Sequence, residues 1–199
     1  MRDYKCLSKQ IYSLNEYQII PIRDQDRYDI MQWRNEQIYH LRQNKPLTSE
    51  DQEYYFSNVI ASLFEQDKPN QILFSFLENG KCIGYGGLVH INWIDKNAEI
   101  SFIIATELEN NSFQKHWMTY LKLVEELAFE ELNLHKIYTY AFDLRQHLYL
   151  VLEASGFHEE ARLKEHCYFD GKYLDVVINS KINKSKLNIH FKRLRNKYS

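Results

Sequence analysis

The chain has 199 residues and a net charge of only -2, with 44% hydrophobic and 26% charged residues. This composition is typical of a folded globular protein and excludes a disordered chain. The length suits a single domain that buries roughly 70% of the surface its unfolded chain exposes.

The cysteines and the apolar runs exclude further classes. Cys6, Cys82 and Cys167 are too few and too scattered for a disulfide framework or a zinc site. No apolar run approaches the roughly 18 residues of a membrane span, and the N-terminus lacks the apolar core of a signal peptide. We therefore expect a cytoplasmic protein with no metal site and no membrane anchor.

Positive charge is concentrated at the C-terminus. Residues 176–199 contain seven Lys or Arg and no acidic residue, which leaves the rest of the chain acidic. A basic tail can contact nucleic acid or an acidic partner, but a solvated or locally packed tail is the more ordinary interpretation. We see no linker or repeat, and expect one domain over 1–182 followed by a basic extension over 183–199.

The first predicted elements are a strand and two helices. Residues 17–22 form a short apolar run with a proline, which suits an edge strand. Apolar residues at helical spacing predict a helix from 26 to about 42, before the break at Pro46. Ser49, with Gln52 three residues later, predicts a capping box at the start of a second helix.

Three antiparallel strands are predicted next. Segments 71–77 and 81–93 flank Asn79-Gly80, the dipeptide that most strongly predicts a two-residue hairpin. A further turn at 95–97 leads into a strand over 98–105.

A parallel step is predicted after this strand. Residues 114–132 form an amphipathic helix, and residues 135–142 form the next strand. A strand, helix, strand order implies that the two strands run parallel. A shorter helix over 145–155 is expected to stop at Gly156.

The chain is expected to end in a second hairpin. Segments 157–169 and 172–182 flank Asp170-Gly171, another hairpin dipeptide. The predicted fold class is therefore α+β, with a mixed and mostly antiparallel sheet.

This order of elements, together with four segments, resembles the GNAT superfamily of N-acetyltransferases over about residues 17–182. The segments are Gly80-Lys-Cys-Ile-Gly-Tyr-Gly-Gly-Leu88, Ala98-Glu-Ile-Ser-Phe-Ile-Ile104, Ala128-Phe-Glu-Glu-Leu-Asn-Leu-His-Lys-Ile137 and Leu152-Glu-Ala-Ser-Gly-Phe157. Trp33-Arg34-Asn35 and residues 168–175 resemble one branch, that of ribosomal-protein N-terminal acetyltransferases and N-acetyltransferases of nucleotide-linked amino sugars. The resemblance implies helices on both sheet faces and one parallel strand pair splayed at the cofactor cleft.

The resemblance also implies acetyl-CoA as co-substrate. In the family, pantetheine would pair with the strand backbone at Ile103, Ile104 and Ala105. The helix starting near Gln114 would face the pyrophosphate, because unpaired N–H groups and the positive end of the helix dipole meet there. Lys115, His116 and Arg145 would add positive charge.

Three side chains are candidates for the chemistry. Glu99 matches a position where many relatives keep a glutamate that deprotonates the amine, although a strand Glu is as often paired with Lys or solvated. His90 could move a proton near neutrality, although a lone His is more often structural. Tyr149 could protonate the leaving thiolate, although tyrosines usually pack a core with the hydroxyl at its edge.

The chain departs from the family at the cofactor loop. Residues 106–113 contain no glycine, and Phe113-Gln-Lys-His-Trp117 replaces the usual Gly-x-Gly-x-Gly. Glycine permits positive φ and close approach of the backbone to phosphate, so bulky side chains here could obstruct it. Arg145, Leu148 and Leu152 also replace residues that relatives use near the cofactor or as general acid.

The function predicted from these residues is direct transfer of an acetyl group from acetyl-CoA to a small-molecule primary amine, that of a nucleotide-linked amino sugar. The open alternatives are an inactive GNAT-fold binding module, an enzyme using a carrier-protein donor, and one acetylating a protein N-terminus. The acidic main domain does not favour nucleic acid as a partner. The sequence leaves open whether the protein forms a homodimer.

Overall fold

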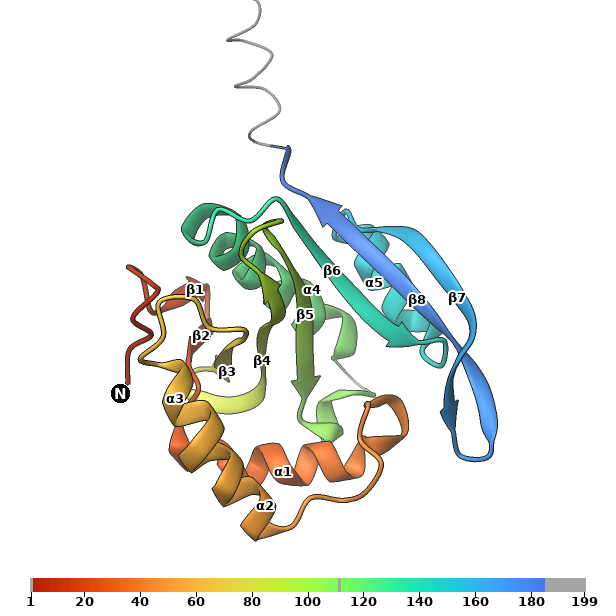
Figure 1. Cartoon of the computed structure of the whole chain (residues 1–199), viewed down its shortest axis with the longest axis horizontal. Helices are drawn as coiled ribbons and strands as arrows, with labels where there is room; N and C mark the ends of the chain where they lie inside the picture. The colour runs from red at the N-terminus through yellow and green to blue at the C-terminus, as the bar shows by residue number, and fades with distance from the viewer. Residues whose placement is uncertain (1, 111, 185–199) are drawn as a thin grey trace, which may run out of the picture.

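The computed structural model describes residues 2–110 and 112–184, and it contains a single eight-stranded sheet in the order β1-β2-β3-β4-β5-β6-β8-β7 (Figure 1). The strands are β1 (Tyr12–Leu14), β2 (Tyr17–Pro21), β3 (Ile72–Glu78), β4 (Lys81–Asn92), β5 (Asn97–Ile104), β6 (Lys136–Phe142), β7 (His158–Phe169) and β8 (Lys172–Ile182). The short strand β1 was not predicted. It pairs with β2 and lies at the sheet edge.

One parallel step interrupts the antiparallel order. β5 and β6 pair only where Asn97–Glu99 lie beside Lys136–Tyr138. Beyond this point β5 continues to Ile104 and β6 to Phe142 without pairing with each other. The mixed, mostly antiparallel sheet with one splayed parallel pair is therefore confirmed.

Both predicted two-residue hairpins form. Asn79 and Gly80 have φ values of 50° and 81°, and Asp170 and Gly171 have 48° and 78°. Positive φ at both central residues is the geometry that Asn-Gly and Asp-Gly favour, because its twist matches that of the flanking strands.

The helices surround the sheet (Figure 1). The regular ones are α1 (Arg27–Glu36), α2 (Ser49–Tyr54), α3 (Ala61–Leu63), α4 (Phe113–Glu125) and α5 (Gln146–Ala154). Wider or tighter turns extend them at η1 (Asp24–Asp26), η2 (Ile38–His40), η3 (Tyr55–Ile60), η4 (Thr106–Leu108) and η5 (Glu126–Glu131). In Figure 1, α4 and α5 pass behind the sheet, while α1 to α3 lie along its lower edge.

Two predictions near the N-terminus were wrong in detail. The first helix ends at Glu36 rather than near Arg42: Gln37 leaves the helical conformation, with φ -108° and ψ 20°, and its side chain donates to the Ile104 carbonyl at 2.7 Å. The capping box uses Thr48 and Asp51 instead of Ser49 and Gln52. The Gln52 amide is buried and donates to the Arg27 carbonyl at 2.7 Å.

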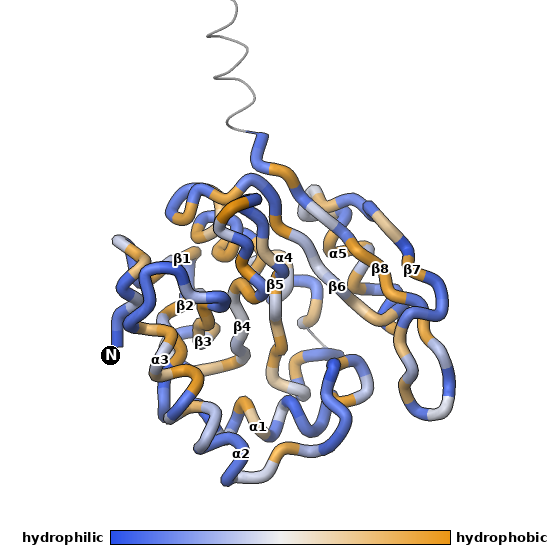
Figure 2. The backbone as a smooth tube through the Cα atoms, viewed as in Figure 1, coloured by the Kyte–Doolittle hydropathy of each residue, from blue (hydrophilic) through white to orange (hydrophobic). Residues whose placement is uncertain are grey.

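Part of the core lies between the sheet and α4, and part is formed by residues of α1, η3 and α3 such as Ile30, Phe56 and Ile60. Tyr120, Leu121 and Val124 on α4 are fully buried, and the Tyr120 ring stacks on Phe102 of β5 at 3.7 Å. Figure 2 shows hydrophobic stretches along the central strands and α4, with hydrophilic residues dominating the connections. In the part of the chain that is described, none of the helices has the length and apolar character needed to cross a bilayer.

Most of the predicted basic extension, residues 185–199, lies outside the described residues. Asn183, where that extension was predicted to begin, is buried and its backbone N–H donates to the His135 carbonyl at 2.8 Å.

Candidate active site

A small cavity of about 100 Å³ lies where β5 and β6 separate. Its wall is formed by these two strands, the start of α5, the middle of α4 and the residues after α1. Its charged lining residues are Arg34, Arg42, Glu99 and Arg145, and its aromatic ones include Phe102, Trp117, Tyr140 and Phe142.

Glu99 is the acidic residue at this branch point. It belongs to the last pair of the parallel step, opposite Tyr138, and is only 5% exposed. Its carboxylate binds the Arg42 guanidinium, and its second oxygen lies 3.8 Å from Nε2 of His90. Burial raises the pKa of Glu99, and Arg42 and His90 oppose that shift. A buried carboxylate with a raised pKa is suited to accept a proton near neutral pH.

His90 reaches Glu99 because β4 is irregular here. The register between β4 and β5 shifts between Val89 and Asn92, and His90 has a φ of 50°. Because Val89 is paired with Glu99, a regular strand would turn His90 to the opposite face. The bulge re-aims the imidazole toward the carboxylate.

The β5 backbone beyond Glu99 alternates between β4 and the cavity. The Ala105 N–H donates to the Ile83 carbonyl of β4 at 2.8 Å. Because alternate residues of a strand bond to the same neighbouring strand, the backbone groups of Ala105 and Ile103 both point toward β4. The backbone groups of Ile104 and Phe102 point away from β4, toward the cavity. The Ile104 carbonyl already accepts from Gln37. Of the three predicted pantetheine partners, only Ile104 therefore directs its backbone groups toward the cleft. The backbone of Phe102, which was not predicted, also points there.

The described residues of the glycine-free connection from β5 to α4 adopt no left-handed backbone conformation. Residues 106–110 and 112, the described part, all have negative φ, and the connection makes bonds such as Ser112 N–H to the Leu108 carbonyl at 3.2 Å. Gln37 and Glu36 of the α1 region also hydrogen bond to Thr106. Helical turns anchored to α1 thus replace a glycine-rich loop.

Aromatic rings fill the space behind this connection. Phe113 and Trp117 are buried, and the Trp117 ring contacts Phe102 edge-on at 4.9 Å. Trp117 lines the cavity, and its buried Nε1–H has no partner among the described residues. A buried, unpaired donor carries a free-energy penalty that a hydrogen bond from a ligand would relieve.

Arg145 completes the wall of the cavity. Its guanidinium is 10% exposed, lies 5.8 Å from the ring centres of Phe113 and Trp117, and is 3.6 Å from Glu109. Burial lowers the pKa of Arg145 and raises that of Glu109, and each partner opposes the shift of the other. Both groups are thus pushed toward neutrality, so their attraction does not fully offset their desolvation.

A second cavity of about 820 Å³ opens at the N-terminus of α4. Its lining includes the predicted residues Gln114 and Lys115 together with His147. The Lys115 ammonium, however, is directed to Glu16 at 3.3 Å and lies over the Tyr17 ring.

His116 and Tyr149 line neither the cavity beside Glu99 nor the cavity at the α4 N-terminus. His116 is buried between α4 and the sheet, with its ring edge-on to Tyr17 and its Nε2 3.9 Å from Glu78. The Tyr149 hydroxyl donates to Asp143 at 2.8 Å, and burial raises its pKa.

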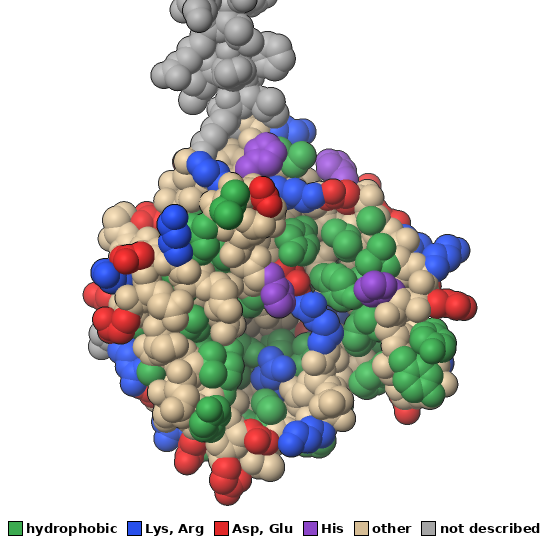
Figure 3. Space-filling model, viewed as in Figure 1, with side chains coloured by type: hydrophobic (Ala, Val, Ile, Leu, Met, Phe, Trp, Pro, Cys, Tyr) green, Lys and Arg blue, Asp and Glu red, His purple; other side chains and the backbone are tan. Residues whose placement is uncertain are grey.

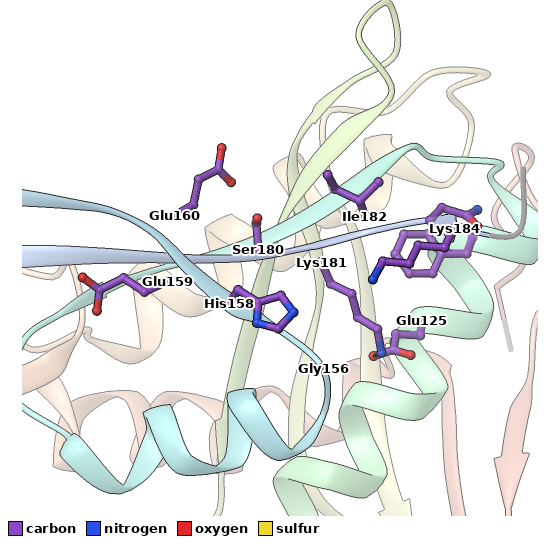
Figure 4. A pocket seen from close by; sticks show the side chains of 11 residues that line it. Glu125, Gly156, His158, Glu159, Glu160, Ser180, Lys181, Ile182 and Lys184 are labelled. Atoms are coloured by element: carbon purple, nitrogen blue, oxygen red, sulfur yellow. Dashed lines mark hydrogen bonds and ion pairs between the residues drawn. The ribbon is translucent and has the colours of Figure 1, made fainter. Parts of the chain in front are cut away.

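A third cavity, of about 610 Å³, lies at the other end of β6 (Figure 4). Figure 4 shows Lys181 reaching Glu125 across it, and the Lys181 ammonium bonds Glu125 at 2.6 Å and the Ser155 carbonyl at 2.7 Å. These charges satisfy one another, and the predicted site residues do not line this cavity.

Sequence reasoning did not identify Arg42 or Arg34 as site residues. Arg42 lies over the Tyr140 ring at 4.7 Å, and Arg34 donates to the Tyr85 hydroxyl at 2.6 Å. In Figure 3, basic and histidine side chains surround a hollow in the middle of the visible face. The segment Trp33-Arg34-Asn35 was a signal for Arg34, whereas Arg42 follows the helix in a stretch with no motif.

Comparison with known proteins gives the same fold and a family. Residues 19–178 match the model of the acetyltransferase (GNAT) domain. Spermidine N(1)-acetyltransferase of Vibrio cholerae serotype O1 is 34% identical over 109 residues, which are 52% of this chain and 61% of that relative. The chain thus matches less than two thirds of the relative's length.

Two solved structures show the same fold. The spermidine N-acetyltransferase from Vibrio cholerae in complex with CoA and spermine has a TM-score of 0.73 at 23% identity, covering 87% of this chain and 99% of that one. A dodecameric form of the Vibrio cholerae enzyme has a TM-score of 0.71 at 24% identity, covering 88% and 98%.

These relatives are polyamine acetyltransferases, so the comparisons do not support the narrower likeness to the ribosomal-protein and amino-sugar branch. The broader prediction, that of the GNAT acetyltransferase fold and family, is confirmed. The family model covers most of the sequence, and the chain belongs to the GNAT acetyltransferase family.

Proposed function

We propose that the protein transfers an acetyl group from acetyl-CoA to a primary amine, with Glu99 as the general base. The observation that carries this proposal is the buried Glu99 carboxylate at the point where β5 and β6 separate, beside a cavity. The amine would attack the thioester carbonyl, Glu99 would take the proton of the amine, and the CoA sulfur would leave.

Three features support acetyl-CoA as the donor. The Ile104 and Phe102 backbone faces the cleft, and the unpaired Trp117 Nε1–H offers a donor to a pantetheine amide. The 820 Å³ cavity beside the α4 N-terminus has room for the nucleotide end, and helix N-termini favour phosphate. We assign the pyrophosphate to the first amides of α4 and to Arg145, since Lys115 and His116 are turned toward the sheet edge.

Two acceptors are candidates. The names of the relatives favour a polyamine such as spermidine. The sequence prediction of a nucleotide-linked amino sugar is favoured by Arg34 and Arg42, which line the cavity around Glu99. Both acceptors present a primary amine, so the same base would serve either one.

We also propose that the protein self-associates. The exposed rings of Tyr168 and Tyr173, which contact each other at 5.1 Å near the β7–β8 turn, support a contact surface there. Sedimentation of the full chain tests this proposal, and a monomer at micromolar concentration would contradict it.

Ligand binding is tested first by thermal unfolding with acetyl-CoA, CoA and pantetheine, because a ligand of the native state must raise its stability. Stabilisation by the full nucleotide supports the proposal. No stabilisation by any of the three indicates an inactive module, and stabilisation by pantetheine alone indicates a carrier-protein donor.

Turnover is tested by release of the CoA thiol with spermidine and with a UDP-linked amino sugar. Glu99→Gln should lower kcat/KM by about 10² to 10⁴ at neutral pH, the range for loss of a general base. The control is Glu160→Gln, which removes a carboxylate from β7 that pairs with Lys136. Full activity of Glu99→Gln would remove Glu99 from the mechanism.

A further inference from the structure

Arg42 stands between the buried base and the solvent. Its guanidinium binds the Glu99 carboxylate, yet the Arg42 side chain is 46% exposed whereas that of Glu99 is 7% exposed. The guanidinium also lies over the Tyr140 ring at 4.7 Å. An acceptor that approaches Glu99 from the cavity therefore meets Arg42, which lines the same cavity.

Positive charge dominates around this base. Of the arginines that line the cavity, Arg42 is paired with Glu99 and Arg145 with Glu109, whereas Arg34 has no carboxylate partner among the described residues. Arg34 donates to neutral groups, the Tyr85 hydroxyl and the Gln43 amide oxygen. The cavity therefore favours a ligand that carries negative charge, and disfavours a polyamine with several positive charges.

We propose that Arg42 binds an anionic group of the acceptor, such as a phosphate, and that this contact releases Glu99 from its ion pair so that it can act as the base. This inference rests on the proposed acetyltransferase function and specifies the class of its acceptor as an anionic amine. Arg42 acts as a specificity-determining residue, because it binds the anionic group of the acceptor and at the same time sets how strongly Glu99 binds a proton.

The coupling follows from the groups that face Glu99. These are Arg42 from the connection after η2, His90 from β4, and Tyr138 and Tyr140 from β6. Arg42 stabilises the ionised carboxylate and so makes it a weaker base. When a phosphate takes the guanidinium, Glu99 loses this stabilisation, and its affinity for the proton of the amine increases. A polyamine, which has no anionic group, cannot produce this exchange.

The test compares three acceptors in the wild type, Arg42→Gln and Arg42→Lys. The acceptors are a UDP-linked amino sugar, the same free amino sugar without phosphate, and spermidine. We expect the wild type to prefer the UDP-linked amine by at least tenfold in kcat/KM. Arg42→Gln should reduce that preference by tenfold or more, and Arg42→Lys should restore part of it. Arg2→Gln is the matched control, because Arg2 is 48% exposed and is paired with Asp24.

A pH profile separates this role from a structural one. Without Arg42 the Glu99 carboxylate is less stabilised, so the acidic limb of kcat/KM for the free amino sugar should move to higher pH in Arg42→Gln. A wild type that prefers spermidine would overturn the inference. It is also overturned if Arg42→Gln slows all acceptors equally with an unmoved limb while CoA still raises its melting temperature. Absence of transfer to any amine by the wild type would instead refute the proposed function.

Discussion

The ion pair between Glu109 and Arg145 joins the β5–α4 connection to the start of α5, and its removal has a calculable effect. At 3.6 Å and an effective dielectric constant of about 20, the attraction between two unit charges is roughly 4–5 kcal/mol. Both side chains are nearly buried, but the desolvation cost of each residue alone cancels in a double-mutant cycle, which isolates the interaction between the two. Residues in contact couple by about 0.5–3 kcal/mol in such cycles, and we expect a coupling of about 2 kcal/mol here.

Urea unfolding of Glu109→Gln, Arg145→Met and the double variant measures this coupling as a double-mutant cycle. Glu109→Gln leaves a buried guanidinium without its counter-charge and should lose about 2–3 kcal/mol of unfolding free energy. The double variant should lie within about 1 kcal/mol of the wild type, because it removes both charges. A coupling below about 0.5 kcal/mol would refute the reasoning.

The same variants test the assignment of Arg145 to the pyrophosphate. Glu109→Gln frees the guanidinium from its competitor, so CoA should bind at least as tightly as it binds to the wild type. Arg145→Met should weaken CoA about tenfold or more while affecting pantetheine little, since pantetheine has no pyrophosphate. Calorimetric titration measures both affinities, and equal losses for the two ligands would contradict the assignment.

Three further predictions concern stability and the cleft. Gly86→Ala should lose at least about 3 kcal/mol of unfolding free energy in urea, because its Cβ would lie 2.1 Å from a backbone oxygen of β5. The control Gly80→Ala places its Cβ in open space and should lose about 1 kcal/mol. Burial lowers the pKa of His40 to about 3, so the unfolded chain binds a proton that the native chain does not, and stability should fall as the pH drops from about 6.5 toward 3. His40→Gln should therefore keep more of its neutral-pH stability at pH 4.5 than the wild type, and the exposed His158→Gln should not; equal acid sensitivity of all three would refute the burial argument. Trp117→Phe, which deletes the unpaired N–H, should weaken CoA about fivefold in calorimetry, and unchanged affinity would show that this donor does not meet the ligand.

The order of the elements and the single parallel step could be predicted from the sequence because their signals are local. Asn79-Gly80 and Asp170-Gly171 supply the positive φ values that their turns require, and residues 114–132 carry a helical apolar period. Glu99 could be placed on the strand bordering the cleft, because its motif fixes its distance from the turn before it. Such features depend on neighbours within a few residues.

Only the tertiary structure determined what surrounds the base. Arg42 binds Glu99 across 57 residues of sequence, and Gln37 reaches the Ile104 carbonyl across 67. His90 faces the carboxylate only because a bulge breaks the alternation of β4, and His116 turns toward the sheet because its helical face is buried. By itself the sequence determined the fold and the strand that carries the base. The charges that surround the base depend on the path of a connection and on strand register, which are set by packing between elements far apart in the chain.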